Sequence, residues 1–271
     1  MSFIQENKIE LNLSLKNEYK LIHISDVHAV TYKDTDSKEE IDEALKAEEL
    51  WYKQRTWFAN RAKEHHDESH MIQSKDCLTN LVNYINDEKP NVAILSGDII
   101  DYYTKSNYEL LVNSIKNINC PYVFCNGNHE PNIDKYTEIT NSIIGFSTLN
   151  FDEFKIVSLD NSSKSVSKET LVLVKKELEE DKPIIIVMHI PISTKYNENE
   201  MKKFDPYFVI YENDTDETTK EFIDILVNNN NIKAILCGHT HGHLESYFAP
   251  NKLQCCASSG LIGLVNKIII K

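Results

Sequence analysis

The chain lacks several features that mark particular classes of protein. None of its apolar runs approaches the roughly 20 residues needed to cross a bilayer, and Met1 to Ser14 lack the basic and then apolar pattern of a secretory signal. Glycine and proline number only seven each, and no stretch rich in glycine, proline or serine resembles a linker. We therefore expect a cytoplasmic protein with no membrane contact, in which residues 1–271 form a single domain.

Positive charge is also scarce. The net charge is −13, and only two of the 29 basic residues are arginines. Proteins that hold nucleic acid mainly through their surface present broad basic patches, so we do not expect nucleic acid as a partner. A small phosphorylated substrate is compatible with this charge, because two bound metal ions would make its site locally positive.

The six cysteines indicate neither disulfides nor a zinc site. All of them lie in or beside apolar segments with strand-like or helical patterns, and their spacings match no zinc-binding pattern. Reduced thiols that pack against apolar neighbours are the better interpretation, in keeping with a reducing compartment.

Apolar periodicity predicts alternating strands and helices. We expect an edge strand near the N-terminus and further strands at 20–24, 92–95, 122–125, 154–159, 184–188, 233–237, 253–257 and 265–270. Helices are expected at 76–87, near 108–115, at 168–180 and at 216–228. This alternation indicates a layered α/β fold.

A long helix is predicted at 38–64. Ser37 and Glu40 form a capping box at its start, and apolar residues then recur on one stripe that includes Trp51 and Arg55. Two roles are open for Arg55, which could pair with a carboxylate on a packed surface helix or clamp a phosphate group. The histidines that follow are interpreted as a solvated polar face: His65, His66 and His70.

Five strand-like runs end in residue types that bind metals. These residues are Asp26 and His28, Asp98, Asn128 and His129, His189, and His239 and His241. Active sites of α/β folds lie beyond the carboxyl ends of the strands. One such residue has an ordinary explanation as a core histidine or a turn aspartate, but five segments in chain order predict a metal site.

The same segments carry the patterns D-x-H, G-D-x-x-D, G-N-H-E, a strand-terminal histidine before a proline-containing loop, and G-H-x-H. In this order they resemble the calcineurin-like metallophosphoesterase superfamily, from about residue 20 to the C-terminus. The resemblance implies an α/β/β/α sandwich, in which two mixed sheets are flanked by helices. The chain would carry a helical insertion at about 29–75 and a loop insertion at about 193–216.

The resemblance also implies two divalent metal ions. One would be held by Asp26, His28, Asp98 and His241, and the other by Asp98, Asn128, His189 and His239, so that Asp98 bridges them. Mixed nitrogen and oxygen donors suit manganese, iron, zinc, cobalt and nickel, and the resemblance places manganese first. Only two of the seven ligands carry charge, so the ions would leave positive charge for a hydroxide and a phosphate oxygen to neutralise.

The expected reaction is the hydrolysis of phosphomonoesters or phosphodiesters. A hydroxide that bridges the ions would attack phosphorus without a covalent phosphoenzyme. His129 resembles the family's histidine that protonates the leaving oxygen, as a general acid. Glu130 would orient His129 and raise its pKa, whereas Asp101 would hold its own loop by hydrogen bonds rather than touch a metal.

Several alternatives stay open. Phosphoprotein phosphatases of the superfamily usually carry an arginine immediately before G-N-H-E, and Asn126 lies there in this chain, which favours substrates of modest size. A nuclease, or a metal-retaining scaffold that binds other proteins, is the alternative function. The face from Trp51 to Phe58 could form a wall above the metals, or the helix at 38–64 could form the interface of a homodimer.

Overall fold

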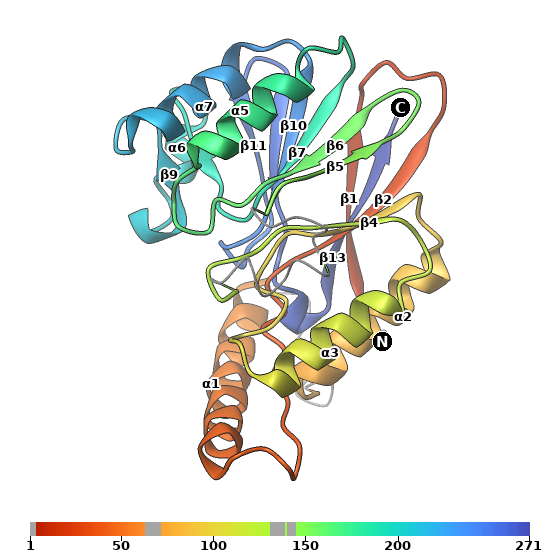
Figure 1. The fold of residues 1–271 in the computed structure, drawn as a ribbon, viewed down its shortest axis with the longest axis vertical. Coiled ribbons are helices and arrows are strands. Elements are labelled where there is room, and N and C mark those ends of the chain that lie inside the picture. The colour runs from red at the N-terminus through yellow and green to blue at the C-terminus, as the bar shows by residue number, and fades with distance from the viewer. Residues whose placement is uncertain (1–3, 63–71, 131–138, 140–144) are drawn as a thin grey trace.

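Two large mixed sheets lie face to face, and helices cover the outer face of each (Figure 1). This arrangement is seen in a computed structural model that describes residues 4–62, 72–130, 139 and 145–271, except for the side chains of residues 56–62. It confirms the predicted α/β/β/α sandwich. The single-domain organisation stays a prediction.

The first sheet has the strand order β1-β13-β2-β3-β4. Its strands are β1 (Gln5–Leu11), β2 (Tyr19–Ile24), β3 (Val92–Leu95), β4 (Tyr122–Phe124) and β13 (Leu264–Ile270). Strands β2, β3 and β4 are parallel, whereas β13 is antiparallel to β2 and parallel to the edge strand β1. The outer face of the sheet is covered by α2 (Ser74–Glu88) and α3 (Lys105–Lys116).

The second sheet has the strand order β11-β12-β10-β7-β6-β5. Its strands are β5 (Ser147–Asn150), β6 (Lys155–Ser158), β7 (Ile184–Val187), β10 (Ile232–Cys237), β11 (Leu244–Ala249) and β12 (Lys252–Cys256). The four inner strands are parallel, and the two edge strands are antiparallel to their neighbours. Helices α5 (Lys168–Glu177) and α7 (Glu217–Asn228) cover the outer face.

The central strands are buried on both faces. In β2, Leu21 packs between the two sheets and Ile22 packs under the helices. In β7, Ile185 packs between the two sheets and Ile186 packs under the helices. A strand buried on both faces reads as a continuous apolar run, which explains why the sequence located these strands to within a few residues.

Two segments lie outside the layers. Helix α1 (Lys38–Ala62) projects from one end of the molecule (Figure 1), and its capping box is present because the Glu40 N–H donates to Ser37 Oγ at 3.2 Å. The segment 193–216 carries four short elements, the first of which begins one residue before it. They are β8 (Ile192–Ser193), α6 (Glu198–Met201), η3 (Pro206–Phe208) and β9 (Ile210–Tyr211).

Two strands of the second sheet were not predicted. Both β5 and β11 are edge strands that are partly exposed and carry polar residues, so neither reads as an apolar run. The cysteines agree with prediction, since all six are free and five of them are buried. Within the described residues, no helix combines the length and the apolar character that a membrane span requires. His65, His66 and His70 lie outside the described residues.

Candidate metal centre

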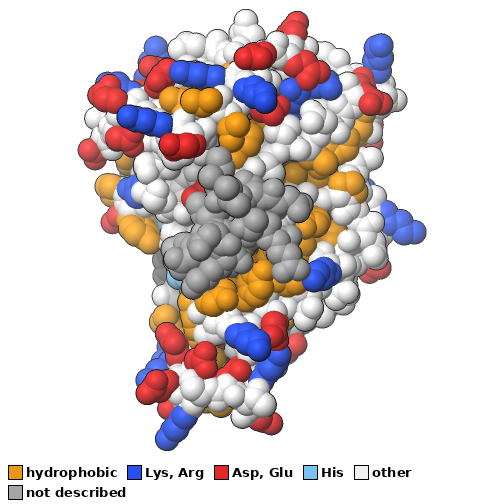
Figure 2. All heavy atoms as spheres, in the orientation of Figure 1, with side chains coloured by type: hydrophobic (Ala, Val, Ile, Leu, Met, Phe, Trp, Pro, Cys, Tyr) orange, Lys and Arg blue, Asp and Glu red, His pale blue; other side chains and the backbone are white. Residues whose placement is uncertain are grey.

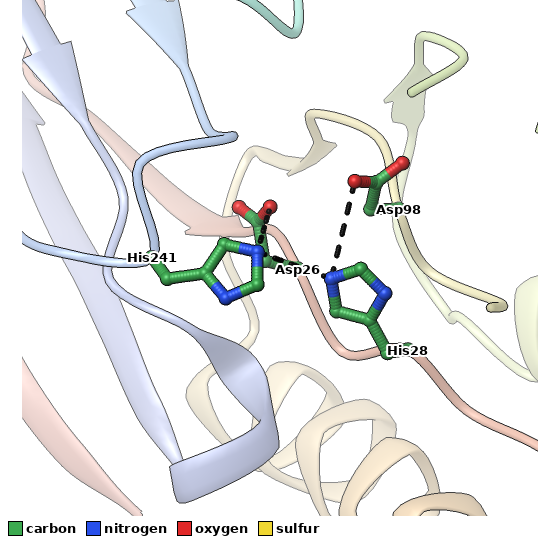
Figure 3. A group of neighbouring side chains, drawn as sticks. All are labelled: Asp26, His28, Asp98 and His241. Carbon is green, nitrogen blue, oxygen red and sulfur yellow. Dashed lines mark hydrogen bonds and ion pairs between the residues drawn. The ribbon is translucent and has the colours of Figure 1, made fainter. Parts of the chain in front are cut away.

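The polar residues singled out in the sequence meet at one edge of the sandwich. Each group follows the carboxyl end of a parallel strand, and these ends lie together in the two sheets. The residues are Asp26 and His28 after β2, Asp98 after β3, Asn128 and His129 after β4, His189 after β7, and His239 and His241 after β10. Figure 3 shows four of them, Asp26, His28, Asp98 and His241, pointing toward one another from three loops.

The first group of donor atoms combines Asp26, His28, Asp98 and His241. The Nε2 atoms of His28 and His241 lie 3.2 Å apart, and His241 Nε2 lies 3.3 Å from Asp26 Oδ1. His28 Nδ1 lies 3.1 Å from the Asp101 carboxylate and donates its proton there, so His28 Nε2 carries a lone pair. Burial lowers the pKa of His28, which favours the neutral imidazole that a metal ligand needs. Two imidazole nitrogens and two carboxylates gathered this closely could hold a metal ion.

The second group combines Asp98, His189 and His239. His189 Nδ1 donates to the Ser96 carbonyl at 2.7 Å, so its Nε2, which lies 3.1 Å from both Asp98 Oδ2 and Asn128 Oδ1, is the nitrogen that could bind a metal ion. Burial opposes a charge on His189, but the Asp98 carboxylate raises the pKa of His189 to about 10. The same carboxylate would attract a metal ion to this position.

Both groups fit divalent ions of the transition series. They offer imidazole nitrogens together with carboxylate and amide oxygens, and Asp98 belongs to both. All seven residues predicted as ligands are thus brought together. Their role as ligands stays a prediction.

The backbone at this site is strained. Five of the seven residues have positive φ angles, between 47° and 66°, in a region that residues other than glycine seldom adopt. They are Asp26, His28, Asp98, His239 and His241. Such strain persists only where the surrounding structure enforces it, and it is concentrated at functional sites. Close packing helps, because a Cβ atom on Gly127 would lie 2.0 Å from Asp98 Oδ1.

His129 lies at the border of the site with about a third of its side chain exposed. Its Nδ1 atom is 2.8 Å from the Asp101 carboxylate and 2.8 Å from the Asp101 carbonyl oxygen. Burial lowers the pKa of His129, but the hydrogen bond to Asp101 and the charge of Asp98 outweigh it and raise this pKa to about 9. Asp101 therefore holds two imidazoles, those of His28 and His129.

Glu130 does not orient His129, and that prediction was wrong. Its carboxylate is fully buried and accepts hydrogen bonds from four backbone N–H groups at 2.7 to 3.0 Å. The donors are Asp98, Ile99, Ile100 and Gly127. Glu130 thus joins the loops after β3 and β4, because its side chain turns inward while that of His129 turns toward the cavity.

A cavity of about 420 Å³ opens above these residues. Apart from the residues of the metal centre, its walls come from α1 and from the segment after His189. The former supplies Leu50, Trp51 and Gln54, and the latter Lys203, Phe204, Asp205, Tyr207 and Phe208. The sequence predicted a loop insertion at about 193–216 but did not single out the aromatic residues of this second wall. The aromatic run from Phe204 to Phe208, after the strand-terminal His189, could have indicated them.

Trp51 forms the wall that was hypothesised for the helix. Its ring stacks on that of His28, with centroids 3.9 Å apart and planes at 23°. Arg55 is buried away from the cavity and pairs with Glu48, which confirms the carboxylate pairing and makes the phosphate clamp wrong. The Phe58 side chain lies outside the described side chains.

The geometry agrees with a comparison of the chain with known families. The family model for the calcineurin-like phosphoesterases matches residues 19–243. The chain belongs to this family. It is also similar to a probable cyclic nucleotide phosphodiesterase of Coxiella burnetii, with 25% identity over 161 residues. These residues cover 56% of the chain and 60% of that relative.

A second relative is a probable glycerophosphodiester phosphodiesterase of Arcobacter nitrofigilis. It is 26% identical over 184 residues, which cover 60% of the chain and 62% of the relative. The chain thus spans about six-tenths of the length of these curated relatives. A dimetal phosphatase from Danio rerio has the same fold, with a TM-score of 0.59 at 10% identity over 90% of the chain and 88% of that structure.

Proposed function

We propose that this protein hydrolyses small phosphate esters with the help of two divalent metal ions. The observation that carries the proposal is the convergence of imidazole nitrogens with carboxylate and amide oxygens on both sides of Asp98. Transition-series divalent ions prefer this mixture of nitrogen and oxygen donors. Both relatives are named as probable phosphodiesterases, which favours phosphodiesters over phosphomonoesters as substrates.

The ions would be held by the two groups that share Asp98. Bound there, they would supply a water activated for attack on phosphorus and positive charge against the phosphate oxygens. Manganese is the first choice, ahead of iron and zinc, with cobalt and nickel also suited to mixed nitrogen and oxygen donors.

His129 is proposed as the general acid. Burial opposes a charge on this imidazole, but the hydrogen bond to Asp101 and the charge of Asp98 raise the pKa of His129 to about 9, which favours the protonated imidazole that a general acid requires. Asp101 accepts the hydrogen bond from Nδ1, so the proton on Nε2 is the one available to the leaving oxygen. Asp101 also orients His28, and therefore positions a ligand and the acid together.

The test combines metal analysis with two substrates. The purified protein is loaded with manganese and assayed with p-nitrophenyl phosphate and bis(p-nitrophenyl) phosphate, alongside Asp98→Ala. We expect about two ions per chain and turnover of the diester in the wild type, and loss of both in the variant, because Asp98 belongs to both groups. A fully metal-loaded wild type that hydrolyses neither ester would favour the protein-binding scaffold.

The nuclease alternative is less well supported. Lys203 is the one lysine or arginine among the described residues that line the cavity. On the face seen in Figure 2, lysine and arginine side chains are interleaved with acidic ones and form no continuous basic stripe. A polynucleotide would need further cations along its backbone.

The oligomeric state and the cytoplasmic location stay predictions. Helix α1 exposes Leu45 and Leu50 by about half, which is compatible with the homodimer proposed through residues 38–64. Sedimentation analysis of the wild type and of Leu45→Glu would decide this, because a dimer through α1 should dissociate in the variant.

A further inference from the structure

The cavity has two walls that border different parts of the metal centre. On one side Trp51 stacks on His28 in the first donor group. On the other side the Tyr207 ring lies 5.4 Å from that of His239 in the second group. Helix α1 and the segment 193–216, which contains Tyr207 and β9, accordingly lie on either side of the strand ends (Figure 1). A substrate whose phosphate lies at the metals must place its organic group between these walls.

Tyr207 is exposed yet held in place. Its side chain is 56% exposed, and its hydroxyl oxygen accepts from Asn128 Nδ2 at 3.4 Å. Its backbone N–H donates to the Asp205 carboxylate at 2.8 Å, and its ring meets Phe208 edge-on at 5.2 Å. Lys164 Nζ donates to the Pro206 carbonyl at 2.7 Å and fixes the same turn. A rigid aromatic ring loses little entropy when a ligand packs on it.

The charge of the cavity limits the substrate further. Among the described lining residues outside the proposed ligands and His129, Lys203 and Asp205 carry opposite charges and the others are uncharged. A second phosphate group would therefore find no excess of cations beyond the metals. The apolar surface is aromatic on the loop side and aliphatic at Leu50, which is 54% exposed. A volume of about 420 Å³ suits a compact ligand.

Resting on the proposed function, we propose that the substrate carries one phosphate ester group and an uncharged organic group with a flat ring, which packs on Tyr207. Aromatic rings prefer edge-on or offset contact with one another and gain energy beyond the area they bury. A saturated ring of similar size buries comparable apolar area but lacks this gain. Flatness, rather than apolar character alone, is therefore what the loop wall selects.

The test measures binding with phosphonates that cannot be hydrolysed. Isothermal titration calorimetry on the manganese-loaded protein compares benzylphosphonate, cyclohexylmethylphosphonate and methylphosphonate. We expect benzylphosphonate to bind about three- to tenfold more tightly than the cyclohexylmethyl compound. Tyr207→Phe should keep this preference and Tyr207→Leu should lose it. Tyr196→Leu is the matched control, because Tyr196 is 45% exposed in the same segment but does not line the cavity.

Two outcomes would overturn the inference. Equal affinity of the wild type for the flat and the saturated ring would do so, and so would an unchanged preference in Tyr207→Leu. Neither outcome touches the phosphoesterase function, which is measured separately by the turnover of p-nitrophenyl esters. Conversely, the protein could prefer benzylphosphonate and yet hydrolyse none of the p-nitrophenyl esters. That result would overturn the proposed reaction but not the binding of a flat ring to Tyr207.

Discussion

At the scale of single residues, the Asp101 carboxylate connects two parts of the site. It accepts from Nδ1 of His28, a proposed metal ligand, and from Nδ1 of His129, the proposed acid. Burial raises the pKa of Asp101, but its hydrogen bonds to His129 and His28 outweigh burial and hold that pKa well below its usual range. One charged group thus sets the orientation of both rings.

Replacing His129 should separate metal binding from proton transfer. His129→Ala is expected to keep both ions, because His129 belongs to neither proposed ligand set. It should lower kcat/KM by about 100- to 10,000-fold for esters of alkyl alcohols and far less for p-nitrophenyl esters, whose leaving group needs no proton. Steady-state kinetics on the two classes, with metal analysis, makes the comparison. Equal losses on both classes would argue against the acid role.

Replacing Glu130 should destabilise the loops rather than alter chemistry directly. Glu130→Gln puts an NH₂ group against two of the four buried N–H donors, at an expected cost of about 2–3 kcal/mol in unfolding free energy. Urea unfolding followed by circular dichroism gives the value. Glu153→Gln is the control, since Glu153 also accepts two backbone N–H groups, from Lys16 and Asn17, but does so near the surface. A Glu153 variant that loses as much stability would contradict the argument from burial.

At the scale of elements, helix α1 is attached to the body through Glu48. This carboxylate pairs with the buried Arg55 and accepts from the backbone N–H and the hydroxyl of Ser74, at the start of α2. The attachment fixes Trp51 on His28, one turn further along the helix. The position of the aromatic wall therefore depends on an ion pair that does not line the cavity.

Removing this attachment should loosen α1. Glu48→Ala leaves Arg55 buried without its carboxylate, which is expected to reduce the local stability of α1 by up to about 3 kcal/mol. Hydrogen exchange of the α1 amides measures the change. Glu49→Ala is the control, because Glu49 pairs with Lys53 with both side chains 69% exposed, and such a pair contributes less than about 1 kcal/mol. Similar exchange in the two variants would show that Glu48 does not anchor the helix.

The elements found from sequence and those missed differ in burial. The runs at β3, β7 and β10 are apolar because both faces are covered, so their pattern is visible without any partner. Strand β5 has no buried residue, and β8 and β9 have two residues each, too short for any periodicity. Pairing with neighbours, rather than composition, makes these segments strands.

At the scale of the whole molecule, the metal centre joins both sheets. Its proposed ligands follow three strands of the first sheet and two of the second, so bound ions would tie the layers together. Manganese at about 100 times its dissociation constant should add about 2.7 kcal/mol and raise Tm by about 5–10 °C. A chelator should reverse the shift, and thermal scans measure it. Asp98→Ala should show almost no shift.

The metal-induced shift should depend on pH. Imidazole ligands bind metals only when their nitrogen is unprotonated, so protons compete with the ions and binding releases protons. The rise in Tm on adding manganese should therefore be larger at pH 8 than at pH 6. Thermal scans at both values, with and without metal, give the difference. A shift that is the same at both values would indicate ligands other than histidine.

The sequence by itself determined the strands that are buried on both faces and the residues that follow their carboxyl ends, because burial on both faces and the types of metal donor are local properties of the chain. Only the tertiary structure decided which groups each of the neighbouring polar side chains contacts. Glu130 rather than Asp101 holds the loops, since the direction of a side chain depends on what surrounds it. Tyr207 reaches the metal centre although 18 residues separate it from His189, because folding brings its turn back over the strand ends.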